Sequence, residues 1–386
     1  MQLDSIRVLD LTRLLPGPYA TQLLCDAGAD VIKIEDTDSG DYARSMPPMT
    51  TRGVGSLFDA VNRGKKSVGL DLKTDGGREA FYRLLNDADV VIESFRPGVT
   101  ERLGIEYETV YEQNPSIVYC SLSGYGQTGP LAEQAGHDLN YVGRAGLLDM
   151  TRGDENSTPV VPGYQVADMG GGLFAAFAIV GALCSRELSD GTGEYIDVGM
   201  TDVVLSFAQS LTAGVFSEES PRPSETPLTG ELPWYDIYET ADGKYVTLAA
   251  LEPQFWGAFC RAIDRKDLCD KHMISGPAER QVLREELEAV FCERTREEWV
   301  KAFDDVDATV DGVYTPSEAV ESTQCRARGL IQDGDAPPRI GFPAVCDLPA
   351  SDESIPDHGE HTEELLRAAN YDAAAIERLR ETGAVT

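Results

Sequence analysis

The stretch that decides the fold runs from Ile6-Arg7-Val8-Leu9-Asp10-Leu11 to Asp30-Val31-Ile32-Lys33-Ile34. Both ends are short apolar runs rich in β-branched residues, which predict two strands. Between them, Pro18 to Ala27 predicts a helix, and Gly28 is a natural helix stop. A strand, a helix and a second strand in this order are typical of a parallel sheet.

The same alternation continues to about residue 125. It predicts strands at 67–72, 90–93 and 117–122 and a helix at 74–86. We therefore expect an α/β fold with a mostly parallel, doubly wound, Rossmann-like sheet. The turn after the first strand, Arg13 to Pro18, lacks the GxGxxG pattern, so a conventional dinucleotide site is not expected.

The chain of 386 residues is too long for one typical domain. Residues 217–232 are rich in Pro, Ser and Glu, which predicts a linker. Before it, the apolar run Gly170 to Arg186 predicts a buried helix, too short to span a membrane. We predict a large Rossmann-like domain at 1–216, the linker at 217–232, a small α+β domain at 233–325 and a C-terminal segment at 326–386.

The small domain is expected to open with a hairpin. Its strands are predicted at 237–239 and 245–249, joined through Asp242-Gly243. Helices are predicted at 253–263, 279–291 and 296–303, and two amphipathic helices close the chain at 362–369 and 372–381.

The charge balance is extreme, with 66 acidic and 33 basic residues and a formal net charge of −33. An acidic partner-binding surface is one interpretation. The other is an acidic, solvated shell like that of halophilic proteins, in which counterions screen the self-repulsion, and the dispersal of the acids along the chain favours it. A nucleic-acid partner is not expected, because phosphate neutralisation needs a basic surface.

Eight cysteines form no CxxC pair, which predicts reduced core residues and neither a disulfide frame nor a metal site. The first residues lack a basic segment followed by an apolar one, so no secretory signal is expected. We predict a soluble cytoplasmic protein without a membrane segment.

The residues best suited to chemistry are His137, Asp168 and Glu252. His137 is the first histidine of the chain, and Asp168 precedes a run of glycines that would let a ligand approach the backbone. An imidazole and a carboxylate can move a proton near neutral pH. Structural roles also fit: a satisfied histidine, a cap for a helix starting at Met169, and a helix-start acid before Pro253.

Several motifs together resemble the alpha-methylacyl-CoA racemases, a branch of the class III CoA-transferase (CaiB/BaiF) superfamily. The matching segments are 123–130, 136–141, Asp168 with its glycines, 197–200, 235–238, 241–243 and 251–255. The resemblance implies an acyl-CoA substrate, no cofactor beyond the CoA of that substrate, and an interlocked homodimer with shared active sites. It also implies that the C-terminal segment returns to the large domain.

The resemblance assigns His137 and Asp168 to opposite faces of the α-carbon of a 2-methylacyl-CoA, which would be epimerised through an enolate. Glu252 would fix the tautomer of the histidine. In the CoA-transferase alternative, Asp168 is a nucleophile that forms a mixed anhydride and an aspartyl-CoA thioester. His137 favours the racemase, because transferases of the superfamily typically lack a histidine there.

The resemblance also implies a CoA site. Its expected contacts are Arg63, Lys66, Leu72, Lys73 and Arg102. Where racemases often place a phosphate-binding arginine, this chain has Asp36, so Lys33 or Arg44 is expected to replace it.

The motif around His137 suggests three further roles. Gly136 is expected to offer a backbone N–H to the thioester oxygen, Asp138 to cap the next helix and Tyr141 to line the acyl pocket. Branched-chain, bile-acid-like and short dicarboxylic acyl groups all stay open.

Overall fold

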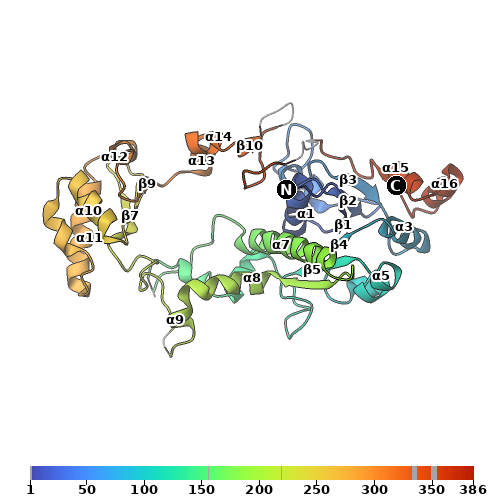
Figure 1. The fold of residues 1–386 in the computed structure, drawn as a ribbon, viewed down its shortest axis with the longest axis horizontal. Helices are drawn as coiled ribbons and strands as arrows, with labels where there is room; N and C mark the ends of the chain where they lie inside the picture. Colours follow the sequence, from blue (N-terminus) through green and yellow to red (C-terminus); the bar gives the residue numbers. More distant parts are fainter. Residues whose placement is uncertain (1, 155, 219, 333–336, 349–353) are drawn as a thin grey trace. The chain divides into compact units, whose positions relative to one another are not determined.

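The computed structural model describes residues 2–154, 156–218, 220–332, 337–348 and 354–386 (Figure 1). The chain forms two compact units. The first comprises Met1–Leu147, Pro162–Ala208 and Arg326–Thr386, and the second comprises Leu148–Val161 and Gln209–Cys325. The predicted boundary at 216 differs from this division, in which residues 148–161 and 209–216 also belong to the second unit. Composition does not reveal that the loop between α6 (Asp138–Arg144) and α7 (Val166–Leu188) leaves the first unit.

A six-stranded parallel sheet forms the centre of the first unit. The strands are β1 (Arg7–Leu11), β2 (Asp30–Glu35), β3 (Lys66–Gly69), β4 (Val90–Glu93), β5 (Val118–Ser123) and β6 (Tyr195–Gly199). Their order is β3-β2-β1-β4-β5-β6, with parallel pairing throughout. The order runs outward from β1 in both directions, so the predicted α/β fold with a doubly wound sheet is confirmed. Strand β6 was not predicted, because its first residues are partly exposed and do not form an apolar run.

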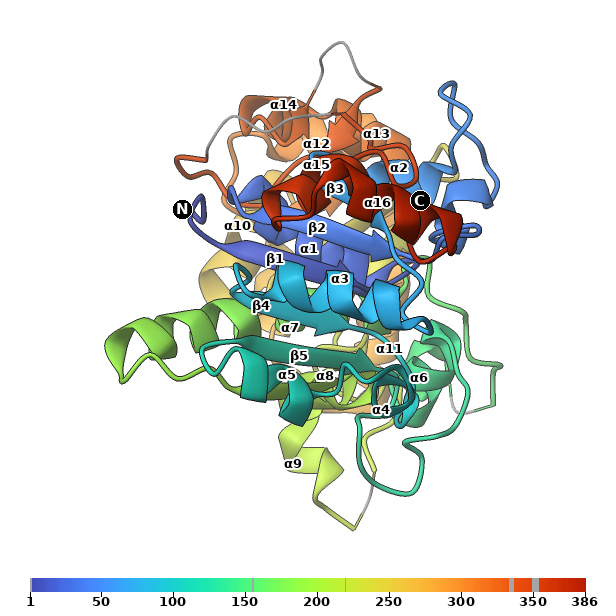
Figure 2. The same cartoon turned by 90° about the vertical axis from the view of Figure 1, so that its right-hand side faces the viewer.

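Helices cover both faces of this sheet (Figure 2). One face meets α1 (Pro16–Asp26) and α7 (Val166–Leu188), which pack closely on each other. The other face lies under α3 (Asp75–Leu85), α5 (Tyr107–Gln113), α15 (Thr362–Ala368) and α16 (Ala373–Glu381). The core on that side is continuous from the strands to the C-terminal helices, with Leu9, Ile32, Phe81 and Leu366 fully buried.

The C-terminal segment joins the first unit through backbone hydrogen bonds. The N–H of His361 donates to the carbonyl of Ser67 at 2.9 Å, and the N–H of Asp71 donates to the carbonyl of Ala384 at 2.9 Å. A β-bridge also pairs Leu70 with Val385. The segment after β3 is thereby fixed from the end of the chain.

Helix α7 is longer than the predicted 170–186, and it is the one described helix long and apolar enough to cross a membrane by length and composition. It packs against α1, β5 and β6, as expected of a core helix. The prediction of a buried helix is wrong for one face, where Leu173, Phe174 and Phe177 are 53%, 48% and 70% exposed. An apolar run around a whole helix does not tell which side is covered.

The second unit contains an antiparallel sheet of β7 (Tyr235–Glu239), β8 (Tyr245–Ala249) and β9 (Val310–Gly312). The predicted hairpin forms, and β9 adds a third strand that is too short to stand out in the sequence. Helices α10 (Pro253–Ala262), α11 (Pro277–Phe291) and α12 (Arg296–Phe303) complete its aromatic core, which holds Trp234, Trp256 and Trp299.

The remaining elements are short. They are α2 (Ser56–Val61), α4 (Val99–Leu103), α6 (Asp138–Arg144), α8 (Met200–Phe207), α9 (Thr212–Val215), α13 (Pro316–Glu321), α14 (Thr323–Ala327), β10 (Ile331–Gln332), β11 (Arg339–Ile340) and the 3₁₀ turns η1 (Tyr42–Ser45), η2 (Asp149–Thr151), η3 (Ala208–Leu211) and η4 (Lys266–Lys271).

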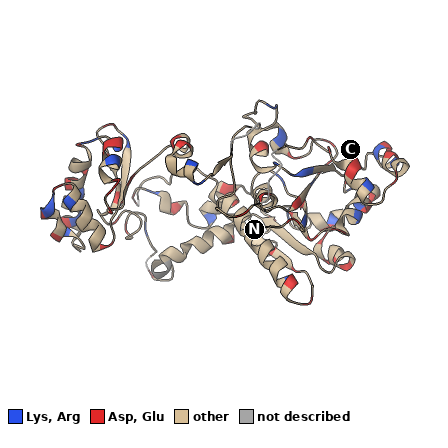
Figure 3. Cartoon of the chain, turned by 45° about the horizontal axis from the view of Figure 1, so that its top comes forward, with Lys and Arg blue, Asp and Glu red and all other residues tan. Residues whose placement is uncertain are grey.

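Charged residues are spread over the surface of both units, and the cysteines are unpaired. Acidic residues lie on helices and loops of both units, interspersed with basic ones (Figure 3). All eight cysteines are free thiols, but the prediction that they are core residues holds only in part. Cys25, Cys120 and Cys260 are buried, whereas Cys184, Cys292 and Cys346 are exposed.

Candidate active site

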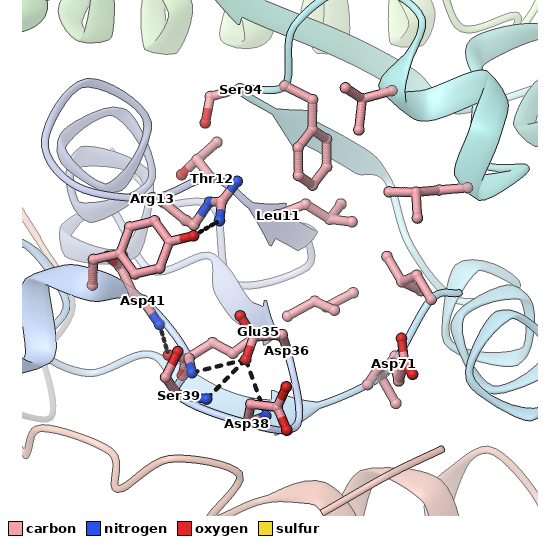
Figure 4. A pocket seen from close by; sticks show the side chains of 18 of the residues that line it. Leu11, Thr12, Arg13, Glu35, Asp36, Asp38, Ser39, Asp41, Asp71 and Ser94 are labelled. Atoms are coloured by element: carbon pink, nitrogen blue, oxygen red, sulfur yellow. Dashed lines mark hydrogen bonds between the residues drawn. The ribbon is translucent and has the colours of Figure 1, made fainter. Parts of the chain in front are cut away.

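A cavity of about 670 Å³ lies in the first unit, where β1, β2 and β4 end (Figure 4). The carboxyl edge of a doubly wound parallel sheet is the usual place for a ligand. The turn after β1, the loop after β2, the segment after β3 and α4 contribute its walls. The lining residues are Leu11–Arg13, Ile34–Asp36, Asp38–Tyr42, Leu70–Lys73, Ser94–Arg96, Val99 and Leu103.

Arg13 is the cation best prepared for an anionic ligand in this cavity. Its guanidinium carbon lies 5.1 Å from the centre of the Tyr42 ring and 5.7 Å from that of Phe95. Its Nη1 donates to the Tyr42 hydroxyl at 3.1 Å. No carboxylate in the described part of the chain pairs with it, so two rings orient the guanidinium without neutralising its charge.

Lys33 and Arg44, the predicted substitutes for a phosphate-binding arginine, are tied up in ion pairs. Lys33 Nζ lies 2.9 Å from Asp41 Oδ2, and both side chains are fully buried. Arg44 donates to both carboxylate oxygens of Glu35, at 2.8 and 2.6 Å. Burial alone would raise the pKa of Glu35, but the Arg44 hydrogen bonds and the Lys33 charge lower it to about 2. These pairs hold the loop after β2 and match both positive charges with carboxylates, so phosphate binding by either cation stays a prediction.

The basic cluster of Arg63, Lys65 and Lys66 is likewise structural. Arg63 is 2% exposed, and its Nη2 lies 2.6 Å from Asp59 Oδ1. Lys65 is buried against Asp10 at 3.3 Å. Lys66 pairs with Asp30 at 2.8 Å. Lys66 begins β3, so it lies at the amino ends of the strands, whereas the cavity lies at their carboxyl ends. The roles of Arg63 and Lys66 as CoA contacts stay predictions.

The other predicted contacts lie at or beside the cavity. Leu72 and Lys73 line it. Arg102 is exposed on α4, between the lining residues Val99 and Leu103, but is not itself part of the wall. Asp36 Oδ1 accepts hydrogen bonds from the N–H groups of residues 38, 39 and 40 at 3.0, 2.9 and 3.1 Å, so this carboxylate shapes the loop.

Asp138, the residue after His137, links the His137 segment to the start of the helix that carries Asp168. His137 is the exposed N-cap residue of α6, and its N–H donates to Asn140 Oδ1 at 3.1 Å. Asp138 Oδ1 accepts from the N–H of Ala167 at 2.7 Å and from that of Asp168 at 3.1 Å. Asp138 therefore caps α7, not the next helix as predicted, because its own helix already has His137 as its N-cap.

Asp168 lies in the first turn of α7, which begins at Val166, so it is not the helix cap that the structural interpretation suggested. Burial, and next the negative charge of Asp138, raise the pKa of Asp168 from 3.8 to about 7. Near neutral pH this carboxyl group is populated both with and without its proton. That is the property a general acid or base needs.

Tyr141 and the glycines around it support the His137 loop. The Tyr141 hydroxyl donates to the carbonyl of Gly136 at 2.6 Å, and its ring meets that of Tyr125 edge to face at 5.1 Å. A Cβ on Gly124 would lie 2.3 Å from the Tyr141 ring, which explains the glycine. Tyr141 is 7% exposed and lines neither the cavity at the sheet edge nor the one beside α2, so its role as an acyl-pocket residue stays a prediction.

Two observations relate the segments that carry His137 and Asp168 to the cavity. Burial raises the pKa of Tyr141 to about 12, and the charges of both Asp168 and Arg96 also act on it. Arg96 lines the cavity. On α7, a Cβ on Gly172 would lie 2.4 Å from the carbonyl oxygen of Pro16, so this helix face meets the turn after β1. Asp168 is four residues earlier and on the same face.

Glu252 belongs to the second unit, where it is the exposed N-cap residue of α10. Its carbonyl accepts from the N–H of Trp256 at 3.2 Å, and its side chain makes no capping bond. Its assignment as a third catalytic group stays a prediction.

Sequence reasoning missed Arg13, Tyr42, Phe95 and Arg96 as cavity residues. Three of them had a usable signal, because Arg13 follows the strand β1 and Phe95 and Arg96 follow β4. Such positions meet at the carboxyl edge of a parallel sheet. Within the described residues, no group of three or more His, Cys, Asp or Glu side chains is placed to hold a metal ion.

Comparison with known proteins agrees with this architecture. The model of CoA-transferase family III matches residues 3–362. The chain is 33% identical to human alpha-methylacyl-CoA racemase over 98% of this chain and 96% of that protein. It is 34% identical to a succinyl-CoA:mesaconate CoA-transferase of Haloarcula marismortui over 96% and 97%. The crystal structure of a CAIB/BAIF family protein from Brucella suis superposes with a TM-score of 0.82 at 30% identity, covering 95% of this chain and 99% of that one. The chain belongs to CoA-transferase family III.

Proposed function

We propose that this enzyme epimerises the α-carbon of 2-methylacyl-CoA thioesters, with His137 and Asp168 as the two proton-transferring groups. The observation that carries the proposal is the pKa of about 7 for Asp168, next to the loop that presents His137. A carboxyl group of this pKa can both remove and return a proton near neutral pH. A permanently ionised nucleophile would not need such a shift.

The reaction requires two proton carriers and a place for the enolate charge. One group removes the α-proton, the electron pair moves onto the thioester oxygen, and the other group returns a proton to the opposite face. Burial of Asp168, and next the negative charge of Asp138, raise the pKa of its carboxyl group, so that the group keeps its proton up to a pH of about 7. The backbone N–H of Gly136 remains our candidate for the oxyanion, as the family motif suggests.

The CoA part is proposed to occupy the cavity at the carboxyl edge of the sheet. Arg13, Lys73 and Arg96 line this cavity and supply positive charge for phosphate groups. No further cofactor is needed, because the thioester itself acidifies the α-carbon. From the family resemblance we also propose an interlocked homodimer. The resemblance further suggests that Glu252 orients His137, and a loss of activity in Glu252→Gln would test that role.

The decisive experiment is deuterium uptake at the α-carbon of single (R)- and (S)-2-methylacyl-CoA enantiomers in D₂O, without an acceptor acid. We expect exchange with loss of stereochemical purity in the wild type. Asp168→Asn and His137→Gln each remove one base. In each variant, the α-proton of one enantiomer should still exchange with solvent while its configuration is retained. The rate of racemisation should fall by a factor of about 10² to 10⁴. Exchange that survives both changes in one chain would overturn the proposal.

The second candidate is CoA transfer between carboxylic acids. Two features favour it: the similarity to succinyl-CoA:mesaconate CoA-transferases, and the position of Asp168 in the first turn of a long helix, where anions are stabilised. Asp168 would attack the thioester carbonyl, which expels CoA thiolate and leaves a mixed anhydride between Asp168 and the acyl group. The thiolate would then attack the aspartyl carbonyl, which releases the first carboxylic acid as its carboxylate and leaves CoA on Asp168 as an aspartyl thioester. CoA transfer to an added acid, together with a borohydride-trapped adduct on Asp168, would identify this reaction.

A further inference from the structure

A second cavity of the first unit, of about 480 Å³, lies between α1, α2 and the segment 337–343. Its wall is mostly apolar, unlike that of the cavity at the sheet edge. The residues that line it are Leu15, Tyr19, Gln22, Leu23, Asp26, Thr50, Ser56, Leu57, Asp59, Ala60, Val61, Arg63, Met169, Pro337–Gly341 and Pro343. Apolar walls with few polar groups are typical of pockets for aliphatic ligands.

This cavity adjoins the turn of α7 that carries Asp168, although Asp168 itself lines neither cavity. Met169, the neighbour of Asp168 on α7, is part of its wall. The turn after β1 separates the two cavities, since Arg13 lines the one at the sheet edge and Leu15 lines this one. The close approach of Gly172 to Pro16 fixes α7 against that same turn. A thioester beside Asp168 can therefore have CoA on one side of the turn and its acyl group on the other.

The charged residues in the wall neutralise one another. Arg339 donates to both oxygens of Asp26, at 3.0 and 2.7 Å. Arg63 pairs with Asp59 Oδ1 at 2.6 Å. In the described residues that line the cavity, no cation is left without a carboxylate. Three buried polar atoms of these lining residues have no hydrogen-bond partner among the described residues: the acceptors Gln22 Oε1 and Asp59 Oδ2 and the donor Arg339 Nε. The two acceptors disfavour a further acceptor group nearby, and the charge of Arg339 is already matched by Asp26.

We propose that this cavity binds the acyl chain of the CoA thioester, and that this chain is aliphatic and uncharged. The inference rests on the proposed function for the position of the thioester beside Asp168. It selects branched or straight aliphatic acyl groups over dicarboxylic ones, because an ω-carboxylate would be desolvated without a counter-charge.

The test measures affinity separately from chemistry. Non-reactive S-alkyl-CoA thioethers, from S-ethyl to S-decyl, are titrated calorimetrically into the full-length protein. Each methylene should tighten binding by about fourfold until the cavity is full. An S-(ω-carboxyalkyl)-CoA of matching length should bind at least about tenfold more weakly than its alkyl counterpart.

A variant pair locates the effect in this cavity. Ala60→Phe fills the space beside α2, and it should abolish the gain from longer chains while leaving S-ethyl-CoA unchanged. Ala374→Phe adds the same ring at an exposed position of α16 outside the cavity and should change neither. Affinity that is independent of chain length, tighter binding of the carboxylate series, or retention of the gain in Ala60→Phe would overturn the inference. A chain-length gain without any α-proton exchange would instead leave the cavity assigned and refute the racemase.

Discussion

Asp138 Oδ1 lies 3.1 Å from the backbone nitrogen of Asp168, so the residue after His137 caps the helix that carries the second proposed base. One short segment thereby presents the imidazole and also fixes the carboxyl group. The same contact also places two acidic side chains close together. Burial is the main reason that Asp168 keeps its proton, and the negative charge of Asp138 is the second. The interaction with Asp138 thus fixes the position of Asp168 and adds to the effect of burial on its pKa.

This arrangement predicts a pH-dependent penalty on stability. The pKa of Asp168 is about 7 in the folded protein and 3.8 as its ordinary value. Between these values the folded state keeps a proton that the unfolded state has lost, so stability falls as pH rises from about 4 to 7. Asp168→Asn removes this cost. The free energy of unfolding of this variant should therefore gain on that of the wild type as the pH rises from about 4 to 7, by at most about 1.4 kcal/mol per pH unit.

Urea unfolding of both proteins at a series of pH values measures this difference. Asp138→Asn serves as the companion variant, because an amide oxygen can still accept the two N–H groups of α7 while the charge is gone. It should lower the pKa of Asp168 and shift the pH dependence of exchange to lower pH. A difference between Asp168→Asn and wild type that stays constant with pH would contradict a raised pKa.

Arg13 is predicted to dominate the binding of CoA phosphates, because two rings orient its guanidinium and leave its charge available. Arg13→Ala should weaken CoA binding by roughly tenfold to a hundredfold, the range for a hydrogen bond to a charged group. Arg13→Lys should recover little, since an ammonium lacks the planar fork that stacks on Tyr42.

Titration of CoA into each variant measures the effect. Arg367→Ala is the control, because it also removes one positive charge but lies on α15 beside Glu363, outside the cavity. Equal weakening in both variants would point to the net charge of the chain and would contradict a specific contact by Arg13.

The sheet was predictable because its strands are compact apolar runs separated by helical segments. Val90 to Glu93 has the predicted bounds, and the ends of the other four predicted strands shift by one to three residues. β6 was missed because its exposed residues, such as Tyr195, carry no apolar pattern. The sequence also did not predict that residues 148–161 belong to the second unit, because contacts in the folded chain place them there and composition does not.

The site was predictable where chemistry is carried by a motif and unpredictable where it depends on pairing. His137 and Asp168 come from distinctive sequence contexts. By contrast, Arg63 and Lys66 look available in the sequence, and only the fold supplies Asp59 and Asp30 as their partners. A basic cluster in an acidic chain is therefore a poor guide to a phosphate site.

The buried pair of Lys33 and Asp41 is predicted to hold the loop that forms one wall of the cavity. Lys33→Met leaves Asp41 charged and buried without its partner, which should destabilise the protein by about 3–5 kcal/mol. Lys66→Met breaks the partly exposed pair with Asp30 and should cost at most about 1 kcal/mol. Chemical denaturation compares the two. Similar losses would show that burial of the first pair has no special effect.

Substitution of two glycines of α7, Gly172 and Gly181, by alanine distinguishes the effect of packing against the turn after β1 from the effect of helix propensity. Ala at position 172 would place its Cβ 2.4 Å from the Pro16 carbonyl oxygen, so Gly172→Ala must push α7 away from the turn after β1. We expect a loss of about 1–3 kcal/mol in stability and reduced α-proton exchange. A Cβ at Gly181 meets nothing within 4 Å, so Gly181→Ala should stabilise the helix by about 0.5–1 kcal/mol. Thermal unfolding and the D₂O exchange assay test both variants. Normal exchange in Gly172→Ala would show that the position of Asp168 relative to this turn is not needed, and would weaken the link between the two cavities and the reaction.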